Sequence, residues 1–341
     1  MKIIITSAFG GHTTTAIAIG RVLKNEKLGF LVSRDAKESI ERLKNENIGK
    51  IFPVTLPRYP DTSSKEASLR FFICMREVYK IFREFKPDIV IGTGASIQVP
   101  AIIIAKVFRC KTVICEANDR KTPSLATRLS KPFSDVVLLP RKELKEHIKD
   151  GIYVGAILPD LGTKDKKSVL DELNLDVNKK TLVFACGTLG APDILKVFFN
   201  LINKDKLSNF NIIISSGKSE VNGKGTYRKN VVMREFFLNF SDILSISDIV
   251  ITRGGLTSYE VAMFGKPQII IPDLNAMADH QSITARELEK RGNAIVLDER
   301  ELSEDKLLNA IERCWSLNPK KLIFEKNRFK RIIYDIVKVN H

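Results

Sequence analysis

The residues best suited to bind a charged ligand lie in residues 248–281, which read as strand, glycine turn, helix, strand and loop. The stretch opens with a short apolar run, as expected of a strand buried on both faces. Gly254 and Gly255 follow, and two adjacent glycines let the backbone turn tightly and approach a ligand closely. We expect Thr257 or Ser258 to cap the next helix, whose N-terminal N–H groups and dipole favour an anion.

Two further groups in this stretch indicate a nucleotide. Glu260 is expected in the first turn of the helix, where a carboxylate can face the same crevice and hold a ribose diol. Asp279, His280 and Gln281 are expected on a loop near the same strand ends. Because ligands bind at the carboxyl ends of strands in open α/β sheets, the stretch predicts half of a nucleotide-diphosphate site. The alternative is an ordinary βαβ unit, since a glycine turn alone is a weak signal.

His12 is a candidate catalytic residue in a glycine loop after the first predicted strand. Gly10 and Gly11 precede it, Thr13 follows, and a helix is expected from Thr15. This arrangement can cradle a phosphate, but it is neither GxGxxG nor Walker A, which disfavours a simple dinucleotide or ATP site. A neutral histidine here could take the proton from an acceptor hydroxyl. A structural contact is the alternative interpretation for a lone histidine.

Glycine turns also follow two other predicted strands. Gly92 and Gly94 end a strand in the N-terminal half of the chain. Gly187, Thr188 and Gly190 end a strand in the C-terminal half, where the hydroxyl and the loop N–H groups can bind pyrophosphate. The two halves therefore repeat one plan of strand, glycine loop and helix.

Glu116 is a second candidate for chemistry. It comes directly after the apolar strand expected at residues 111–115, and Asn118 follows two positions later. A carboxylate in this place could bind an acceptor or act as a competing base. A carboxylate that caps a helix or orders a loop is the alternative.

The composition indicates a soluble globular chain with two domains. The 341 residues suffice for two domains of ordinary size, and the hydrophobic content is 44%. No apolar run approaches the roughly 20 residues needed to span a bilayer, and the first residues read as a buried strand rather than a signal peptide. The five cysteines are scattered without a CxxC pattern, which fits a reducing cytoplasm and predicts no metal site.

The net charge of +15 is concentrated in the first half of the chain. Residues 1–160 carry 27 Lys and Arg against 17 Asp and Glu, and the remainder carries 28 against 23. A basic surface suits nucleic acid, anionic lipid or a phosphorylated substrate. Because no RNA-binding aromatic motif, zinc finger or helix-turn-helix can be defended, we expect no nucleic-acid partner and favour a membrane or a pyrophosphate-linked lipid.

Residues 66–86 combine apolar and basic side chains at near-helical spacing. One interpretation is a core helix with a solvated basic face. The other is a partly exposed aromatic and basic helix that leans on an anionic membrane surface. The candidate membrane-facing residues are Phe72, Met75, Arg76, Tyr79, Phe82 and Arg83.

Taken in order, these motifs resemble the MurG family of GT-B glycosyltransferases. Residues 248–281 resemble its donor-binding signature, and residues 10–12 match its GGH. The chain is also similar to the catalytic subunit of the eukaryotic two-subunit GlcNAc transferase that makes dolichol-linked chitobiose. The resemblance covers nearly the whole chain, with departures: Cys115 and Ala117 replace the His and Gln of the family's HEQN, and Cys186 replaces the first glycine of GGSxGA.

The resemblance implies an α/β GT-B fold with two Rossmann-like domains that face an interdomain cleft. Residues 1–160 would form the acceptor-binding, membrane-facing domain, and residues 161–322 the UDP-sugar-binding domain. Residues 323–341 would form a helix that returns to the first domain.

The resemblance also assigns roles to single residues. His12 would be the catalytic base, with Glu116 as the second candidate. The donor-binding residues would be Gly187, Thr188, Gly190, Phe237, Arg253, Gly254, Gly255, Leu256, Thr257, Glu260, Asp279, His280 and Gln281. The acceptor-binding residues would be Gly10, Gly11, Thr13, Gly92, Gly94 and Asn118.

The implied activity is an inverting transfer of GlcNAc from UDP-GlcNAc to a lipid-pyrophosphate-linked sugar. Thr13 after the GGH favours GlcNAc-PP-dolichol, a β-1,4 linkage and a role in N-glycan precursor synthesis. The alternative is MurG-type transfer to undecaprenyl-PP-MurNAc-pentapeptide. Alternatives of another class are a UDP-GlcNAc 2-epimerase and a non-catalytic UDP-sugar-binding subunit.

The implied surroundings of the enzyme follow from the same resemblance. The chain has no DxD motif, so no metal or other cofactor is expected for the chemistry. We expect a cytoplasmic protein, peripheral on the inner face of the cell membrane. The sequence is compatible with a homodimer or with a membrane-anchoring partner.

Overall fold

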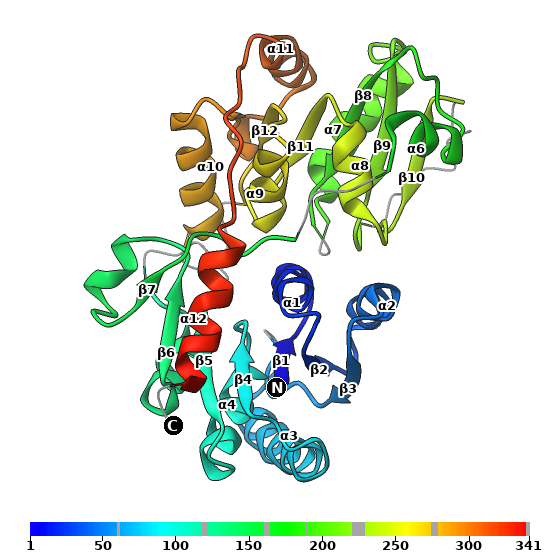
Figure 1. The fold of residues 1–341 in the computed structure, drawn as a ribbon. Coiled ribbons are helices and arrows are strands. Elements are labelled where there is room, and N and C mark those ends of the chain that lie inside the picture. The colour runs from blue at the N-terminus through cyan, green and yellow to red at the C-terminus, as the bar shows by residue number, and fades with distance from the viewer. Residues whose placement is uncertain are drawn as a thin grey trace. The chain divides into compact units, whose positions relative to one another are not determined.

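The chain forms two compact units in a computed structural model. The first unit comprises Met1–Pro159 and Phe324–His341, and the second Asp160–Ile323. The expected boundaries, after residues 160 and 322, differ from these by one residue each. Each unit is a parallel sheet with helices packed on it (Figure 1). The structure describes residues 1–59, 62–116, 122–159, 164–187, 190–219, 229–273 and 279–338.

The sheet of the first unit has seven strands in the order β3-β2-β1-β4-β5-β6-β7, and all neighbours are parallel. Its central strands are continuous apolar runs, because helices cover both faces and no side chain needs to meet water. The strands are β1 (Lys2–Ser7), β2 (Lys27–Ser33), β3 (Lys50–Val54), β4 (Ile89–Gly92), β5 (Lys111–Cys115), β6 (Val136–Leu139) and β7 (Ile152–Tyr153).

Two helix pairs cover this sheet. Helices α1 (Gly11–Val22) and α2 (Lys37–Glu46) contact each other, and α3 (Ser64–Phe85) contacts α4 (Gln98–Val107). The apolar core under α3 and α4 contains alternate strand residues such as Ile4. The remaining helical segments are α5 (Leu125–Ser130), the 3-10 turns η1 (Lys131–Phe133) and η2 (Glu143–Glu146), and α12 (Lys326–Lys338).

Helix α12 belongs to the first unit although it ends the described chain. Phe329 and Ile333 are fully buried there. The Tyr334 hydroxyl donates to Glu26, whose carboxylate also binds the N-terminal amino group. These two hydrogen bonds lower the pKa of Glu26, and the same contact raises the pKa of Tyr334 to about 12. The N-terminal amino group and helix α12 are therefore anchored to the same side chain.

The sheet of the second unit has six parallel strands in the order β10-β9-β8-β11-β12-β13. The strands are β8 (Lys180–Ala185), β9 (Phe210–Ser215), β10 (Val231–Arg234), β11 (Ile249–Thr252), β12 (Gln268–Ile270) and β13 (Ala294–Val296). The helical segments are α6 (Lys166–Glu172), α7 (Pro192–Asn203), α8 (Phe240–Ile246), α9 (Leu256–Met263), α10 (His280–Lys290), η4 (Glu299–Glu301) and α11 (Glu304–Cys314).

In each sheet the strand order reverses at one place. The reversal lies between β1 and β4 in the first unit and between β8 and β11 in the second. Successive connections leave such a point in opposite directions, so a crevice opens at the carboxyl ends of its two strands. The glycine loops identified in the sequence follow these four strands. The topology therefore brings them together in pairs, one pair in each unit.

The structure corrects several local expectations. Phe82 is fully buried in the core, so it cannot face a membrane. Neither Thr257 nor Ser258 caps α9, because Gly255 occupies the N-cap position without a side-chain cap. His280 and Gln281 begin helix α10 instead of lying on a loop.

Two further findings bear on the class of protein. Within the described residues, no helix combines the length and apolarity needed to cross a membrane. All five cysteines are buried free thiols. Burial raises the pKa of the Cys74 thiol to about 12, which keeps it protonated and unreactive at neutral pH.

Candidate active site

His12 is held at the reversal point of the first unit. It is the second residue of α1, and its Nδ1 lies 2.7 Å from the carbonyl oxygen of Thr93, just beyond the end of β4. A carbonyl only accepts hydrogen bonds, so Nδ1 must carry the proton. In the neutral ring the lone pair then sits on Nε2, the atom that can accept a proton. This tautomer is the one that a general base requires.

The conformation of the loop after β4 accommodates the His12 imidazole. Thr93 is fixed to β1, because its N–H donates to Thr6 Oγ1 at 2.9 Å and its hydroxyl donates to the Thr6 carbonyl at 2.7 Å. Gly94 has φ +100°, and a Cβ there would lie 2.7 Å from His12 Cε1. Only glycine therefore leaves room for the ring at this distance.

The glycines of this loop are explained by packing. Gly94 donates its N–H to Gln98 Oε1 at 2.7 Å, and a Cβ on Gly92 would lie 2.6 Å from the Gln98 side chain. Both glycines are buried. Gly92 and Gly94 were predicted to bind the acceptor, and what the structure shows is that they position Gln98 and His12.

Thr13 is a correction to the predicted acceptor site. Its side chain is fully buried. The hydroxyl lies 3.0 Å from Ser7 Oγ and donates to Ser39 Oγ at 2.8 Å, and its N–H donates to the Gly10 carbonyl. Thr13 therefore ties α1 to β1 and α2, and none of these groups faces an acceptor. Gly10, with φ 54° and ψ −121°, makes the sharp turn into α1, and Gly11 is the first residue of that helix.

Glu116 lies at the end of β5 and is almost completely buried. Its Oε2 accepts a hydrogen bond at 3.0 Å from the N–H of Ser124, the N-cap residue of α5. This contact agrees with the alternative in which the Glu116 carboxylate orders a loop. Within the described residues, the buried carboxylate is not seen to reach a surface where an acceptor hydroxyl could bind. Asn118 lies outside the described residues.

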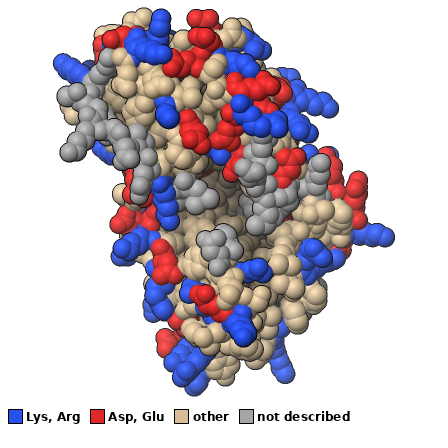
Figure 2. Space-filling model, turned by 180° about the vertical axis from the view of Figure 1, so that it is seen from behind, with Lys and Arg blue, Asp and Glu red and all other residues tan. Residues whose placement is uncertain are grey.

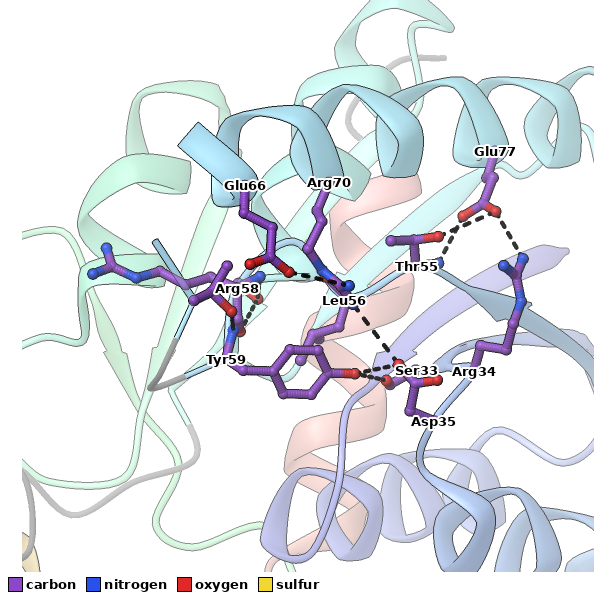
Figure 3. A network of polar contacts seen from close by, with 12 residues as sticks. Ser33, Arg34, Asp35, Thr55, Leu56, Arg58, Tyr59, Glu66, Arg70 and Glu77 are labelled. Atoms are coloured by element: carbon purple, nitrogen blue, oxygen red, sulfur yellow. Dashed lines mark hydrogen bonds and ion pairs between the residues drawn. The ribbon is translucent and has the colours of Figure 1, made fainter. Parts of the chain in front are cut away.

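Two aromatic side chains stack next to His12, in and beside its loop. Phe9, which is 38% exposed, stacks on Tyr59 with 6.2 Å between the ring centroids. The Tyr59 hydroxyl donates to Asp35 at 2.5 Å, and the Arg70 guanidinium lies 5.0 Å from the Tyr59 ring (Figure 3). Arg70 also donates to the Leu56 carbonyl at 2.9 Å. Asp35, which follows β2, and Arg70 of α3 thus hold the Tyr59 ring in place beside Phe9.

In the second unit, the loop after β11 packs closely against α10. Gly254 has φ +79°, and a Cβ there would lie 2.5 Å from the carbonyl oxygen of Gln281. Gly255 differs, because a Cβ there would meet no atom within 4 Å. Gly254 is therefore required by the fold, whereas Gly255 leaves open space at the N-terminus of α9. The N–H groups of that first turn can bind an anion in this space.

A buried polar network holds α9 in place. Thr252 Oγ1 lies 2.8 Å from Ser258 Oγ, and Gln268 Nε2 donates to the Ser258 carbonyl at 3.0 Å. All three side chains are fully buried. Leu256 and Thr257 form the first turn and are half-buried, and half-buried Glu260 is the fifth residue of the helix, not part of its first turn.

Arg253 was predicted to bind the donor, and in the structure its guanidinium joins three strand ends. Nη1 lies 2.5 Å from Glu299 and Nη2 lies 3.5 Å from Asp273, with the side chain only 13% exposed. Glu299 follows β13 and Asp273 follows β12. Sequence reasoning missed both carboxylates. The signal available in the sequence was that both carboxylates, like Arg253, come soon after a strand.

The first turn of α10 adjoins the same loop. Asp279 is the N-cap residue and has a left-handed backbone with φ 53°. Gln281 Oε1 accepts a hydrogen bond at 2.8 Å from the N–H of Asp273. Gln281 is thus brought to the loop after β12, and His280 precedes it in the same helical turn. Glu260 lies on α9, the helix that follows β11. The contacts of these three residues with a donor stay a prediction.

The loop after β8 completes this edge of the sheet. Gly187 is exposed with φ +79°, and a Cβ there would meet no neighbour. The prediction that Gly190 binds the donor is corrected. Its N–H donates to the Gly187 carbonyl at 3.0 Å and is not directed to a pyrophosphate. A Cβ on Gly190 would also lie 2.1 Å from Ser219 Oγ. Thr188 lies outside the described residues.

Phe237 lies three residues beyond the end of β10. Its side chain is buried in the core with the Arg234 guanidinium 5.2 Å from the ring. Any contact of Phe237 with the nucleobase of a donor would therefore use its backbone. Among the described residues, no three His, Cys, Asp or Glu side chains come together as a metal site.

Helix α3 presents part of the predicted membrane face. Phe72 is 70% exposed and Tyr79 is 42% exposed, and Arg76 and Arg83 are exposed beside them. Met75 is only half-buried and packs against the core. Leu69 and Ile73, which the predicted face did not include, are also exposed.

Comparison with known proteins gives a consistent result. The family model described as glycosyltransferase family 28 N-terminal domain matches residues 3–138, and the glycosyltransferase family 28 C-terminal domain matches residues 181–338. Two curated relatives are each named UDP-N-acetylglucosamine–N-acetylmuramyl-(pentapeptide) pyrophosphoryl-undecaprenol N-acetylglucosamine transferase. The protein from Finegoldia magna is 28% identical over 336 residues, covering 93% of this chain and 90% of its own. That from Clostridium perfringens SM101 is 30% identical over 327 residues, covering 91% and 89%.

Solved structures agree on the fold. MurG of Acinetobacter baumannii superposes with a TM-score of 0.64, 18% identity and 99% of both chains covered. UDP-GlcNAc 2-epimerase of Neisseria meningitidis gives 0.68, 13% identity and full coverage of both chains. The expected GT-B fold of two parallel-sheet α/β domains is therefore confirmed. Since both halves of the chain match the family models in order, this chain belongs to glycosyltransferase family 28.

Proposed function

We propose that this protein transfers GlcNAc from UDP-GlcNAc to a lipid-linked pyrophosphoryl-MurNAc-pentapeptide. The observation that carries the proposal is the sequence identity of 28–30% to enzymes named for this reaction, over about nine-tenths of both chains. The dolichol acceptor favoured by Thr13 has no comparable support. Thr13 is buried and contacts Ser7 and Ser39, so its identity says little about the acceptor.

The proposed chemistry is a single displacement. An acceptor hydroxyl attacks the anomeric carbon of GlcNAc, the bond to UDP breaks, and the configuration inverts to give a β-linkage. The hydroxyl proton passes to His12 Nε2, whose lone pair is set by the Nδ1 contact with Thr93. The negative charge that develops on UDP is stabilised by the N-terminal N–H groups of α9, as preorganised dipoles. No metal is assigned a role in these steps.

A UDP-GlcNAc 2-epimerase is the second candidate, because three solved structures titled as such epimerases have the same fold with TM-scores of 0.65 to 0.68. Their identity to this chain is only 13–16%, so this likeness speaks for the fold alone. Incubation with UDP-GlcNAc and no acceptor separates the two candidates. We expect no UDP-ManNAc, and its accumulation would favour the epimerase.

Glu260 is proposed to hold the ribose of the donor. Glu260→Ala should weaken UDP binding by about 10- to 100-fold, the range for losing hydrogen bonds to a charged group. The test is calorimetric titration with UDP and with 2′-deoxy-UDP. The wild type should discriminate between the two nucleotides, and the variant should not. Exposed Glu312 on α11 supplies the control Glu312→Ala. If wild type and variant discriminate equally between UDP and 2′-deoxy-UDP, Glu260 does not hold the ribose.

The exposed part of α3 is proposed to rest on an anionic membrane surface, which makes the enzyme peripheral to the membrane. Phe72→Ser should lower binding to phosphatidylcholine–phosphatidylglycerol vesicles several-fold, because an aromatic anchor is lost. Stability should hardly change, since Phe72 is 70% exposed. The matched control is Ile323→Ser, which removes an 84% exposed side chain from the second unit. If both variants bind vesicles like the wild type, α3 is not the docking surface.

The acceptor itself is tested by comparing rates. UDP release should be fast with a short-chain lipid-PP-MurNAc-pentapeptide and slow with a matched lipid-PP-GlcNAc. We expect the fast reaction to survive EDTA. Faster release with the GlcNAc lipid would restore the dolichol-type assignment, and loss of activity in EDTA that Mg²⁺ restores would contradict the metal-free chemistry.

A further inference from the structure

A basic pocket lies at the outer edge of the first unit's sheet. It has a volume of about 550 Å³ and is lined by the segment before β7, by β7 itself and by the start of α12. Strand β7 is the edge strand, four places from β1 in the sheet. Adjacent strands are about 4.8 Å apart, so β7 lies roughly 19 Å across the sheet from the strand that leads to His12. The pocket is therefore separate from the site described above.

Three lysines of one short segment line the pocket. Lys142 is the N-cap residue of η2, Lys145 lies within η2, and Lys149 lies three residues beyond its end. Leu144 and Ile148 are buried in the core and anchor this segment. The three lysines are exposed and share the same space.

A fourth cation comes from a distant part of the chain. Arg328, on α12, lines the same pocket. Four cationic side chains from two separate segments therefore converge on one small volume. Within the described residues, no ion pair joins any of the four to a carboxylate. The close approach of like charges costs free energy unless an anion is present.

The acidic groups nearby do not compensate this charge. Asp150 is the one carboxylate lining the described pocket, and it is paired with Lys131 at 3.0 Å. Glu143 is paired with Arg141 at 3.3 Å. This differs from the surface in general, where basic and acidic side chains are interspersed on the face seen in Figure 2.

The remaining walls suit a ligand larger than a single ion. Tyr153 lines the pocket, with Lys142 Nζ 5.5 Å from the centre of its ring, and Ile152 adds an apolar surface. A volume of about 550 Å³ lies within the range of about 300–1,000 Å³ found for small-molecule sites. We propose that this pocket binds a phosphate-bearing ligand through Lys142, Lys145, Lys149 and Arg328. The proposal does not depend on the glycosyltransferase reaction.

The first test uses inorganic pyrophosphate, titrated into the full-length protein by calorimetry with UDP saturating. The variant Lys145→Ala/Lys149→Ala should bind the probe about tenfold more weakly at this site, since it removes two of the four cationic side chains. Phosphate contacts elsewhere stay in both proteins and cancel in the comparison. The control Lys24→Ala/Lys44→Ala removes two exposed lysines outside the pocket. Equal binding by wild type and the pocket variant would overturn the proposal.

A second arm identifies the source of the phosphate. The same proteins are floated with phosphatidylcholine vesicles with and without phosphatidylglycerol. Loss of phosphatidylglycerol-dependent flotation in the pocket variant, but not in the control, would support a lipid headgroup. Weaker pyrophosphate binding with unchanged flotation would support a soluble phosphate compound. If the pocket variant binds pyrophosphate as tightly as the control does, the proposal fails whichever flotation result is obtained.

Discussion

Replacing His12 with alanine should lower kcat by about 10²- to 10⁴-fold, the usual contribution of a positioned general base. The expectation rests on the contact between Nδ1 and the Thr93 carbonyl, which leaves the lone pair on Nε2. UDP affinity should not change, because the proposed donor groups lie in the second unit. Steady-state kinetics together with UDP titration measures both quantities.

A structural role for His12 would also lower activity, so a second variant is needed. His12→Asn offers an amide N–H near the position of Nδ1–H and can keep the hydrogen bond to Thr93, but it has no atom in place of Nε2. If His12 is the base, the asparagine variant should be as inactive as the alanine variant. If His12 only holds the loop, asparagine should restore turnover. Exposed His147 provides the neutral control His147→Ala.

The second large effect is expected from a pair of adjacent glycines. Gly254→Ala should destabilise the protein by roughly 2–4 kcal/mol, because alanine disfavours φ +79° and its Cβ would lie 2.5 Å from a backbone oxygen of α10. Gly255→Ala should be nearly neutral for stability, because its φ is −86° and no atom lies near the added methyl group. Urea unfolding of the two variants measures the difference.

The same pair tests the donor site. The methyl group of Gly255→Ala would occupy the open space at the N-terminus of α9, where the diphosphate is proposed to bind, so UDP affinity should fall at least about tenfold. A stable Gly255→Ala protein that binds UDP as tightly as the wild type would show that the diphosphate binds elsewhere. A Gly254→Ala protein as stable as the wild type would contradict the packing of α10 on this loop.

The framework of the fold was predictable from the sequence because buried parallel strands are continuous apolar runs. Once strands and glycine loops were placed in order, the strand reversals brought Gly10 and Gly94 together in one unit and Gly187 and Gly254 in the other. His12 was predicted as a site residue from its own glycine loop, whereas its contact with Thr93 in the loop after β4 was not predicted. Local sequence was sufficient because each of these features is set by a single strand and the turn after it.

Features that depend on distant partners were not predictable. Phe72 and Phe82 have the same residue type on one helix, and only the tertiary packing decides that the first is exposed and the second buried. The burial of Thr13 depends on Ser39 in another helix, and the position of Arg253 depends on Glu299, 46 residues away. The acceptor is a further case, because the choice of sugar and lipid has no signal in a glycine loop.

The measurement that tests the account most directly is mass spectrometry of a short-chain lipid-PP-MurNAc-pentapeptide after incubation with this protein and UDP-GlcNAc. The account predicts that the lipid gains the mass of one N-acetylhexosamine and that the His12→Asn protein, tested alongside, adds it at least about 10²-fold more slowly. An unmodified lipid, under conditions in which the wild-type protein is folded and binds UDP, would contradict the proposed transfer.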